Sequence, residues 1–292
     1  MNFKDLTVPS RVAEIIKEHE FRFKKKFGQN FLVDKNILDK ICDAADLTES
    51  DFVLEIGPGI GTLTNELSKR CKKVVAIEID RDLTQILKET ITADNVDIVE
   101  GDALQLDWQE ILRKSGWQKE TVKLVANLPY YLTSALIMKA LEGEVPFQTI
   151  VVMVQKEVAE RMTAQPGTKA YGILSLAVQY YSQPQLVTNV SRRVFFPAPD
   201  VDSAVVKLQS IEPPVDVASE ELFMVIRAAF GQRRKNLKNT LKNLTTSWNI
   251  APEKVDEIFH QLGIPVNARG ETLSLQKFGE LTRALIHGRN FC

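Results

Sequence analysis

The feature that most constrains the fold is a regular alternation of short apolar runs and helical patterns that begins at Asp51. The runs are rich in Val and Ile, whereas the patterns between them have helical periodicity and about 10 to 12 residues each. A strand, a covering helix and a second parallel strand form one βαβ unit, so this order predicts an α/β fold with a doubly wound, mostly parallel sheet. The runs are 52–57, 73–80, 96–102, 122–127 and 148–155, with helical patterns at 61–70, 81–91 and 133–143.

The flanking sequence divides the chain into two expected domains. Helices are expected over 9–20 and 35–45 before the alternation, and a helix (169–183) and two strands (185–190, 203–211) after it. The proline-containing segment "EPPVD" is then expected to form a stiff linker, beyond which only helical patterns occur. We therefore expect a Rossmann-like domain over 1–212, with a helical and basic N-terminal extension, and a small all-α domain over 217–292.

Composition excludes several classes of protein. Lys and Arg number 37 and Asp and Glu 38, a net charge of −1, so overall charge does not indicate a nucleic-acid partner. The three cysteines and three histidines are scattered, which argues against a disulfide framework and a metal site. No apolar run approaches the roughly 18 residues of a membrane span, and the N-terminus does not resemble a signal peptide. We expect a cytoplasmic protein with no metal and no membrane association.

A glycine-rich turn and three acidic strand ends indicate a nucleoside site. "LEIGPGIGTLT" places Gly57, Gly59 and Gly61 between a strand and a helix, where glycine permits positive φ and close backbone approach to a ligand. The spacing is G-x-G-x-G with Glu55 just before it, rather than the G-x-G-x-x-G of dinucleotide sites, and no Gly-Lys-Ser/Thr follows.

The acids complete the pattern. Glu78 ends the next run, 17 residues after Gly61, where an acid can bind both hydroxyls of a ribose. Asp102 ends the third run, where a carboxylate can accept from an adenine amino group. This pattern resembles the class I S-adenosylmethionine-dependent methyltransferases, whose cofactor has no phosphate and so needs no basic residue in the loop.

The fourth run ends in Asn127-Leu128-Pro129-Tyr130, beside the expected position of the reactive methyl group. The Asn127 amide oxygen and the Leu128 carbonyl could accept the two hydrogens of an adenine amine and direct its lone pair at the methyl group. Pro129 would aim that carbonyl, and Tyr130 could stack on a flipped-out base. Tyr131 reads as a packing residue at the start of the next helix.

Over nearly its full length the chain resembles the ribosomal RNA adenine dimethyltransferases, and is most similar to those that modify the small subunit. The resemblance is carried by five blocks: "KKKFGQNFLVD", "VLEIGPGIGTLT", "NLPYYLTSALI", "VFFPAPDVDSAVVKL" and "FGQRRKNLKNTL". It implies dimethylation of N6 in two adjacent adenosines of a hairpin loop near the 3′ end of small-subunit (16S) rRNA. It also implies an immature 30S particle as partner, with the enzyme a monomer.

The resemblance assigns further residues. It implies that Asn30 and Leu32 join Gly57, Glu78, Asp102 and Asn127 around S-adenosylmethionine. It also implies that Phe195 faces Tyr130 across the target adenine, although Phe196 adds a second ring, which leaves open which one stacks. Lys238 stands where the family often has arginine, which loses a bidentate contact to phosphate.

Two basic runs without acidic residues are expected to contact RNA phosphates, with salt-dependent affinity. Arg192, Arg193 and Lys156 are weaker candidates for the same surface. The two runs contain Arg22, Lys24, Lys25 and Lys26 in the first, and Arg233, Arg234, Lys235, Lys238 and Lys242 in the second.

The sequence is also compatible with other functions. The large-subunit rRNA adenine methyltransferases of macrolide resistance share the cofactor and amine motifs, although the length of the helical domain and "FGQRRKNLKNTL" favour the small-subunit type. A binding protein that kept the fold is a second alternative, which the intact Glu78, Asp102 and Asn127 disfavour. A DNA adenine methyltransferase would need a target-recognition domain, and a nicotinamide oxidoreductase a different glycine spacing.

Overall fold

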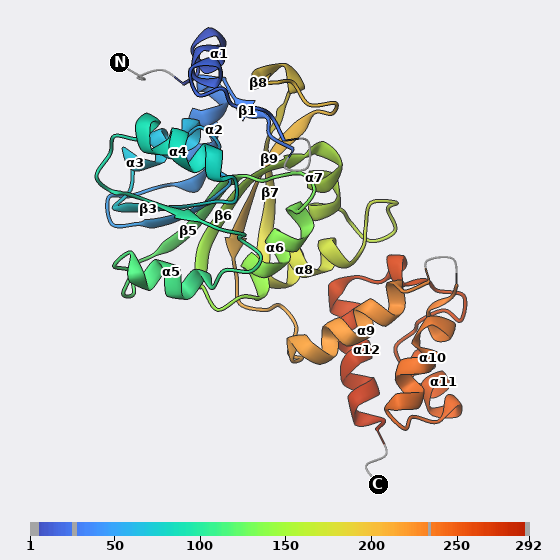
Figure 1. Ribbon diagram of the computed structural model, residues 1–292. Coiled ribbons are helices and arrows are strands. Elements are labelled where there is room, and N and C mark those ends of the chain that lie inside the picture. The colour runs from blue at the N-terminus through green and yellow to red at the C-terminus, as the bar shows by residue number, and fades with distance from the viewer. Residues whose placement is uncertain (1–5, 25–27, 233–234, 290–292) are drawn as a thin grey trace. The chain divides into compact units, whose positions relative to one another are not determined.

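The computed structural model describes residues 6–24, 28–232 and 235–289, which form two compact units (Figure 1). One unit comprises Met1–Ala159 with Gln183–Ser210, and the other comprises Glu160–Ser182 with Ile211–Cys292. The division differs from the expected one because residues 160–182 pack with the C-terminal helices rather than with the sheet. Whether either unit is an independent domain stays a prediction.

The first unit is built on a seven-stranded sheet in the order β4-β3-β2-β5-β6-β9-β7. The pairs from β4 to β6 are parallel, whereas β9 is antiparallel to β6, so the predicted mostly parallel, doubly wound sheet is confirmed. The strands are β2 (Phe52–Ile56), β3 (Lys73–Glu78), β4 (Val96–Glu100), β5 (Val122–Asn127), β6 (Phe147–Gln155), β7 (Ser182–Val190) and β9 (Ser203–Ser210).

Helices cover both faces of this sheet (Figure 1). On one face lie α2 (Lys35–Ala45), α3 (Thr62–Ser68) and α4 (Arg81–Thr90), and on the other α5 (Trp108–Lys114) and α6 (Thr133–Glu142). Asp34, Asp80 and Asp107 start three of them, each accepting a hydrogen bond from a backbone N–H of the first turn. Strand β2 lies between β3 and β5 and is buried at every position, which agrees with a run that is apolar except for Glu55.

The N-terminal extension folds back onto the carboxyl edge of the sheet. Helix α1 (Pro9–Glu18) starts at Pro9, and Val12 and Ile15 pack in a cluster with residues of α4. The short strand β1 (Phe31–Leu32) pairs antiparallel with β8 (Phe195–Phe196), so two of the sequence motifs lie side by side. Neither short strand was expected, because two residues carry no periodicity.

The second unit is helical. Tyr171 is buried here, where its hydroxyl donates to the Leu273 carbonyl at 3.0 Å and its ring contacts Phe230. Within the expected helical region, α9 ends at Phe230, with Gly231 as its C-cap, and Asn236 caps the next helix. The helices are α8 (Ile173–Tyr181), α9 (Ser219–Phe230), α10 (Leu237–Ser247), α11 (Pro252–Gln261) and α12 (Leu275–His287), and α7 (Lys156–Met162) crosses from the first unit.

Two properties of the described residues bear on the expected class of protein. None of the helices in this part of the chain is long and apolar enough to cross a membrane. Within the same residues, His, Cys, Asp and Glu side chains form no group of three or more that could hold a metal ion.

Candidate cofactor and amine site

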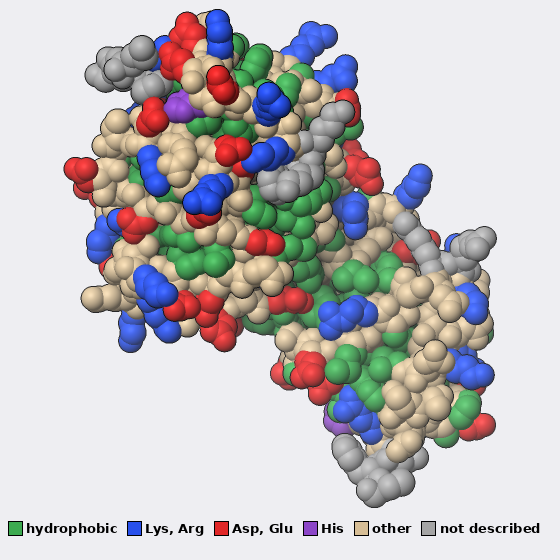
Figure 2. Space-filling view, in the orientation of Figure 1, with side chains coloured by type: hydrophobic (Ala, Val, Ile, Leu, Met, Phe, Trp, Pro, Cys, Tyr) green, Lys and Arg blue, Asp and Glu red, His purple; other side chains and the backbone are tan. Residues whose placement is uncertain are grey.

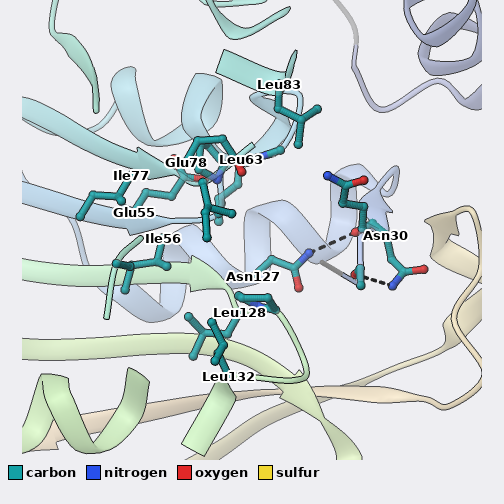
Figure 3. Close-up of a pocket in the computed structure, with 18 of the residues that line it drawn as sticks. Asn30, Glu55, Ile56, Leu63, Ile77, Glu78, Leu83, Asn127, Leu128 and Leu132 are labelled. Carbon is teal, nitrogen blue, oxygen red and sulfur yellow. Dashed lines mark hydrogen bonds between the residues drawn. The ribbon is translucent and has the colours of Figure 1, made fainter. Parts of the chain in front are cut away.

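A pocket lies at the carboxyl ends of β2, β3, β4 and β5, with the N-terminal segment on its other side (Figure 3). It contains about 990 Å³ of empty space, including space open to solvent. All but one of the residues expected to bind the cofactor or the amine line it: Asn30, Leu32, Gly57, Glu78, Asp102, Asn127, Leu128, Pro129 and Tyr130. Phe195 is the exception.

The glycine turn forms the floor of this pocket through backbone geometry. Gly57 and Gly59 have φ of 70° and 63°, in the left-handed region that favours glycine. A Cβ at Gly59 would lie 3.0 Å from the ring of Phe31, so the turn also lets the N-terminal segment approach closely. The Gly59 N–H donates to the Glu78 carboxylate at 3.2 Å, which joins the turn to the end of β3.

Glu78 is a buried carboxylate held by backbone donors. Its side chain is 4% exposed, and Oε1 accepts from the Asp80 N–H at 2.9 Å. Burial raises the pKa of Glu78 to about 7 from an ordinary value of 4.5, and these backbone hydrogen bonds oppose the rise. The position of the carboxylate is therefore fixed, while its charge depends on pH near neutrality.

Glu55, within β2, is buried still more deeply on the same wall. It is 1% exposed, and its Oε2 has no hydrogen-bond partner among the described residues. Burial raises its pKa to about 8; the neighbouring Thr64 hydroxyl opposes the rise, and the charge of Glu78 adds to it. An unpaired buried carboxyl oxygen is costly, so a hydrogen-bond donor or a positive charge entering the pocket would be favoured.

Asp102 follows β4, on a loop that begins at Gly101. Its Oδ1 accepts from the Leu104 N–H at 2.9 Å, and its backbone carbonyl accepts from the Gln105 and Leu106 N–H groups. The Gly101 N–H donates to the Glu78 carbonyl at 2.8 Å, which keeps this loop beside the end of β3.

The electrostatics of the pocket select a class of ligand. Its described lining includes three carboxylates, from Glu55, Glu78 and Asp102, and no Lys, Arg or His. Phosphate groups would be repelled here, whereas a nucleoside with positive charge and no phosphate would be attracted. The residues present fit S-adenosylmethionine, which carries a sulfonium and an ammonium group.

The amine side of the pocket is neutral. The Asn127 Nδ2 donates to the Asn30 carbonyl at 3.4 Å, and the Asn30 Nδ2 donates to the Gly28 carbonyl at 2.8 Å (Figure 3). Because the Asn127 amide hydrogen is directed to the N-terminal segment, its Oδ1 is left as an acceptor on the pocket side. Asn30 thus orients Asn127, a relation between residues 97 positions apart.

The turn after β5 is fixed by hydrogen bonds on both sides. The Leu128 N–H donates to the Met153 carbonyl at 3.1 Å, and the Pro129 carbonyl accepts from the Leu132 N–H and the Thr133 hydroxyl. Tyr130 is half-buried, with its hydroxyl 2.7 Å from the Ser203 hydroxyl of β9. That bond holds the ring at the pocket wall.

Two aromatic residues of the motifs have contrasting surroundings. Phe195 is 4% exposed and belongs to the buried cluster that contains Leu38 and Val205, and its place opposite Tyr130 across an adenine stays a prediction. The partner ring in the motif, Phe196, is half-buried. Tyr131 was expected to pack, yet it is 49% exposed and lines the pocket, because it lies in the turn before α6 begins.

The basic runs are less free than their sequences suggest. Lys24 forms ion pairs with Asp80 at 2.5 Å and Asp82 at 2.7 Å, and Lys238 pairs with Asp256 at 2.5 Å. Arg22 and Lys235 are exposed, with no described carboxylate paired to either. Figure 2 shows cationic and acidic side chains interspersed on the visible face. Four of the expected RNA contacts lie outside the described residues: Lys25, Lys26, Arg233 and Arg234.

Sequence reasoning missed several residues of the site. Gln29 donates to Asp80 at 2.7 Å and accepts from the Lys24 N–H, and together with Lys24 it ties the N-terminal segment to the start of α4. Ile79, 38% exposed, and Leu83 form an apolar wall near Glu78. The hydrophobic pattern placed Leu83 on a helix, but no local signal could show that this helix borders the pocket.

This sheet, with its glycine turn and strand-end acids, defines a class I S-adenosylmethionine-dependent methyltransferase, and the chain uses that cofactor. Within this class the chain belongs to the ribosomal RNA adenine dimethylase family, whose model matches residues 20–278. Relatives called "Ribosomal RNA small subunit methyltransferase A" are 46% identical over 286 residues. One, from Bacillus mycoides (strain KBAB4), has 97% of this chain and 98% of its own length aligned, and one from Anoxybacillus flavithermus has 97% of both.

Two solved structures extend the comparison. A dimethyladenosine transferase from Plasmodium falciparum is 32% identical with a TM-score of 0.74, covering 86% of this chain and 95% of its own. The 23S rRNA methyltransferase ErmE is 28% identical with a TM-score of 0.65, covering 88% and 99%. The curated relatives are the more similar in sequence.

Proposed function

We propose that this protein dimethylates the N6 amines of two adjacent adenosines in a hairpin loop near the 3′ end of small-subunit (16S) rRNA. The observation that carries the proposal is one pocket, without basic residues in its described lining, that joins strand-end carboxylates to the Asn127–Tyr130 turn. The choice of the small subunit is supported by the 45–46% identity to relatives named for it, against 28% to the 23S enzyme.

The cofactor half holds the methyl donor through four sets of groups. Glu78 accepts hydrogen bonds from the ribose hydroxyls, and Asp102 accepts one from the adenine amine. Glu55 attracts the positively charged end of the ligand. The backbone at Gly57, with Asn30, Leu32 and Asn127, encloses the remainder. When bound, the cofactor supplies a methyl group on a positively charged sulfur.

The amine half works by position. The Asn127 Oδ1 and the Leu128 carbonyl accept the two hydrogens of the adenine amine, which orients its lone pair toward the reacting carbon. The Tyr130 ring stacks on the base, and Ser203 fixes that ring through the hydroxyl. No strong base is needed, because a methylated anilinium-like product is acidic enough to lose its proton to water. Both acceptors must also admit an amine that already carries one methyl group.

Further expectations concern partners and location. We propose that Arg22 and Lys235, with the basic residues outside the described ranges, contact rRNA phosphates on an immature 30S particle. We further propose that the enzyme acts as a monomer in the cytoplasm. Arg192 is a weaker candidate than the sequence suggested, because its guanidinium donates to the Asp200 carbonyl at 3.0 Å.

The test is tritiated methyl transfer, in parallel, to undermethylated small subunits, large subunits and naked rRNA. Incorporation into the small subunits, approaching four methyl groups per particle and mapped by primer extension to two adjacent adenosines, is expected. A primer-extension block in the large subunit would overturn the assignment. An Asn127→Ala variant that binds small subunits but transfers no methyl group separates loss of catalysis from loss of binding.

A further inference from the structure

The loop that carries Asp102 is held from outside the pocket by a single lysine. Lys139 of α6 directs its ammonium group at three carbonyls of this loop: Ala103 at 3.0 Å, Leu104 at 3.0 Å and Leu106 at 2.7 Å. The same ammonium lies 4.9 Å from the centre of the Trp108 ring. Lys139 does not line the pocket.

These contacts satisfy every donor of the ammonium group with backbone oxygens of one short segment. A lysine ammonium has three N–H bonds, and charge-assisted hydrogen bonds are roughly twice as strong as neutral ones. Side-chain burial lowers the pKa of Lys139, while the charges of Asp107 and Asp102 oppose that change. A surface ion pair would be weak, but three converging carbonyls in a half-buried place define the path of the loop.

Besides Lys139, the loop is held at its ends, by Trp108 and by its own turn, in which the Leu104 N–H donates to the Asp102 carboxylate and the Gln105 and Leu106 N–H groups donate to the Asp102 carbonyl. Its start is fixed by the Gly101 N–H on the Glu78 carbonyl, and the Trp108 Nε1 donates to the Ala103 carbonyl at 2.8 Å. Between these points, the carbonyls of Leu104 and Leu106 accept hydrogen bonds from Lys139. Asp102 and Ala103 of the same loop line the pocket. A side chain that holds these carbonyls therefore controls where the Asp102 carboxylate sits.

We infer that Lys139 is a positioning residue for cofactor recognition: by holding the 103–106 carbonyls it sets the Asp102 loop for the adenine ring. The inference rests on the proposed role of Asp102. Helix α6 starts at Thr133, directly after the amine turn, so this lysine also ties the loop to the helix that follows Asn127–Tyr130.

The experiment compares two ligands that differ at the purine edge proposed to face Asp102, at C6 and at N1. S-adenosylhomocysteine carries the exocyclic amine, whereas S-inosylhomocysteine carries a carbonyl oxygen, which a carboxylate repels. Calorimetry gives the ratio of their dissociation constants for the wild type, Lys139→Met and Asp102→Asn. We expect the wild type to prefer the adenine ligand by about 100-fold, because a group that hydrogen-bonds a ligand rejects the analogue lacking the donor.

Lys139→Met should reduce this preference at least about fivefold while kcat at saturating cofactor falls less than about threefold. Lys72→Met is the matched control, since Lys72 also lies over an aromatic ring, that of Phe52, and pairs with Glu120 away from the pocket. It should leave the ratio unchanged even where it lowers the melting temperature. Lys139→Gln keeps two N–H donors, so its ratio of dissociation constants should lie between those of the wild type and Lys139→Met. It replaces the methionine variant in the test if that variant does not fold.

The outcomes separate the two levels of the proposal. If the wild type shows no preference, or Asp102→Asn keeps it, the assigned role of Asp102 fails. If Asp102→Asn loses the preference but Lys139→Met and Lys139→Gln keep the wild-type ratio, Asp102 reads the adenine and Lys139 only stabilises the fold, which overturns the inference.

Discussion

The two halves of the pocket achieve binding and chemistry by different means. The charged groups of the cofactor half are the carboxylates of Glu55, Glu78 and Asp102. Glu55 and Glu78 are almost fully buried, and that burial raises their pKa values. The amine half consists of a neutral amide, a backbone carbonyl and a phenol, each held by hydrogen bonds to neighbouring segments. The cofactor half therefore depends on charge, whereas the amine half depends on position.

This difference makes the two halves experimentally separable. Changes in the amine half should lower kcat at constant cofactor affinity, because its groups orient the reacting amine. Changes in the cofactor half should weaken cofactor binding in a pH-dependent manner.

Asn127→Ala should lower kcat by about 10²–10³-fold, the usual loss when a fixed polar group at a reacting centre is removed. Cofactor affinity should fall much less than kcat, because Asn127 is only one of several residues that enclose the cofactor, and the acids Glu78 and Asp102 remain. Single-turnover methyl transfer and calorimetry measure the two effects. Asn189→Ala, an exposed asparagine on β7, is the control and should leave both unchanged. Equal losses of kcat and cofactor affinity in Asn127→Ala would erase the distinction between the halves.

Tyr130→Ala should lower kcat/KM for rRNA by about 10–100-fold, since stacking on one base contributes about 1–3 kcal/mol. Tyr130→Phe keeps the ring and loses only the bond to Ser203, so its loss should stay below about threefold. Steady-state kinetics on small subunits provides the measurement. A phenylalanine variant as impaired as the alanine variant would mean that the hydroxyl, rather than the ring, carries the function.

Glu78→Gln should weaken S-adenosylmethionine by about tenfold or more, because a charge-assisted hydrogen bond to ribose becomes a neutral one. The kcat at saturating cofactor should be nearly retained. Calorimetry measures the affinity, and Glu157→Gln, an exposed acid on α7, is the control. Wild-type affinity in Glu78→Gln would contradict the ribose role.

The wild-type affinity for S-adenosylmethionine should rise with pH, by up to about tenfold per pH unit for each proton that binding releases. In the free protein the pKa of Glu78 is about 7 and that of Glu55 about 8, so binding a cationic ligand must release protons at lower pH. The stability of the free protein should instead fall as the pH rises. Both carboxyls hold protons more tightly when folded, so stability declines as pH rises from about 4.5 through 8.

Calorimetry in buffers of different ionisation enthalpy counts the protons released. Glu78→Gln should reduce the pH dependence between 6 and 7 by one proton, leaving that of Glu55, and thermal melting of the free variant should show a shallower decline with pH. A pH-independent affinity in the wild type would show that the acidic half does not act through its charge.

Lys235→Met should weaken binding to small subunits by about two- to threefold and reduce the salt slope by about one, as expected for one phosphate contact. Lys238→Met should have a smaller effect, because Asp256 already pairs with that ammonium group. Filter binding across a salt series compares them. A larger slope change for Lys238 would mean that its ion pair opens on RNA.

Much of the site could be predicted from the sequence, because its position follows from periodicity and chain direction. Parallel strands end at one edge of the sheet, so Glu78, Asp102 and Asn127 had to meet wherever their strands paired. The glycine turn required positive φ, and both Gly57 and Gly59 have it. The strand ends and the glycine turn can be read from local sequence patterns, and the order of strands and helices along the chain predicts the parallel sheet that brings them together.

Tertiary structure alone decided which side chains are free, buried or paired. Lys24 lies in a run without acids, yet the fold brings Asp80, 56 residues away, within 2.5 Å of its ammonium group. Phe195 became core and Tyr131 pocket wall, and Lys139 reached a loop more than 30 residues earlier in the chain. Charge pairing and burial depend on contacts between distant segments, and those contacts leave no periodic trace in the sequence of either segment.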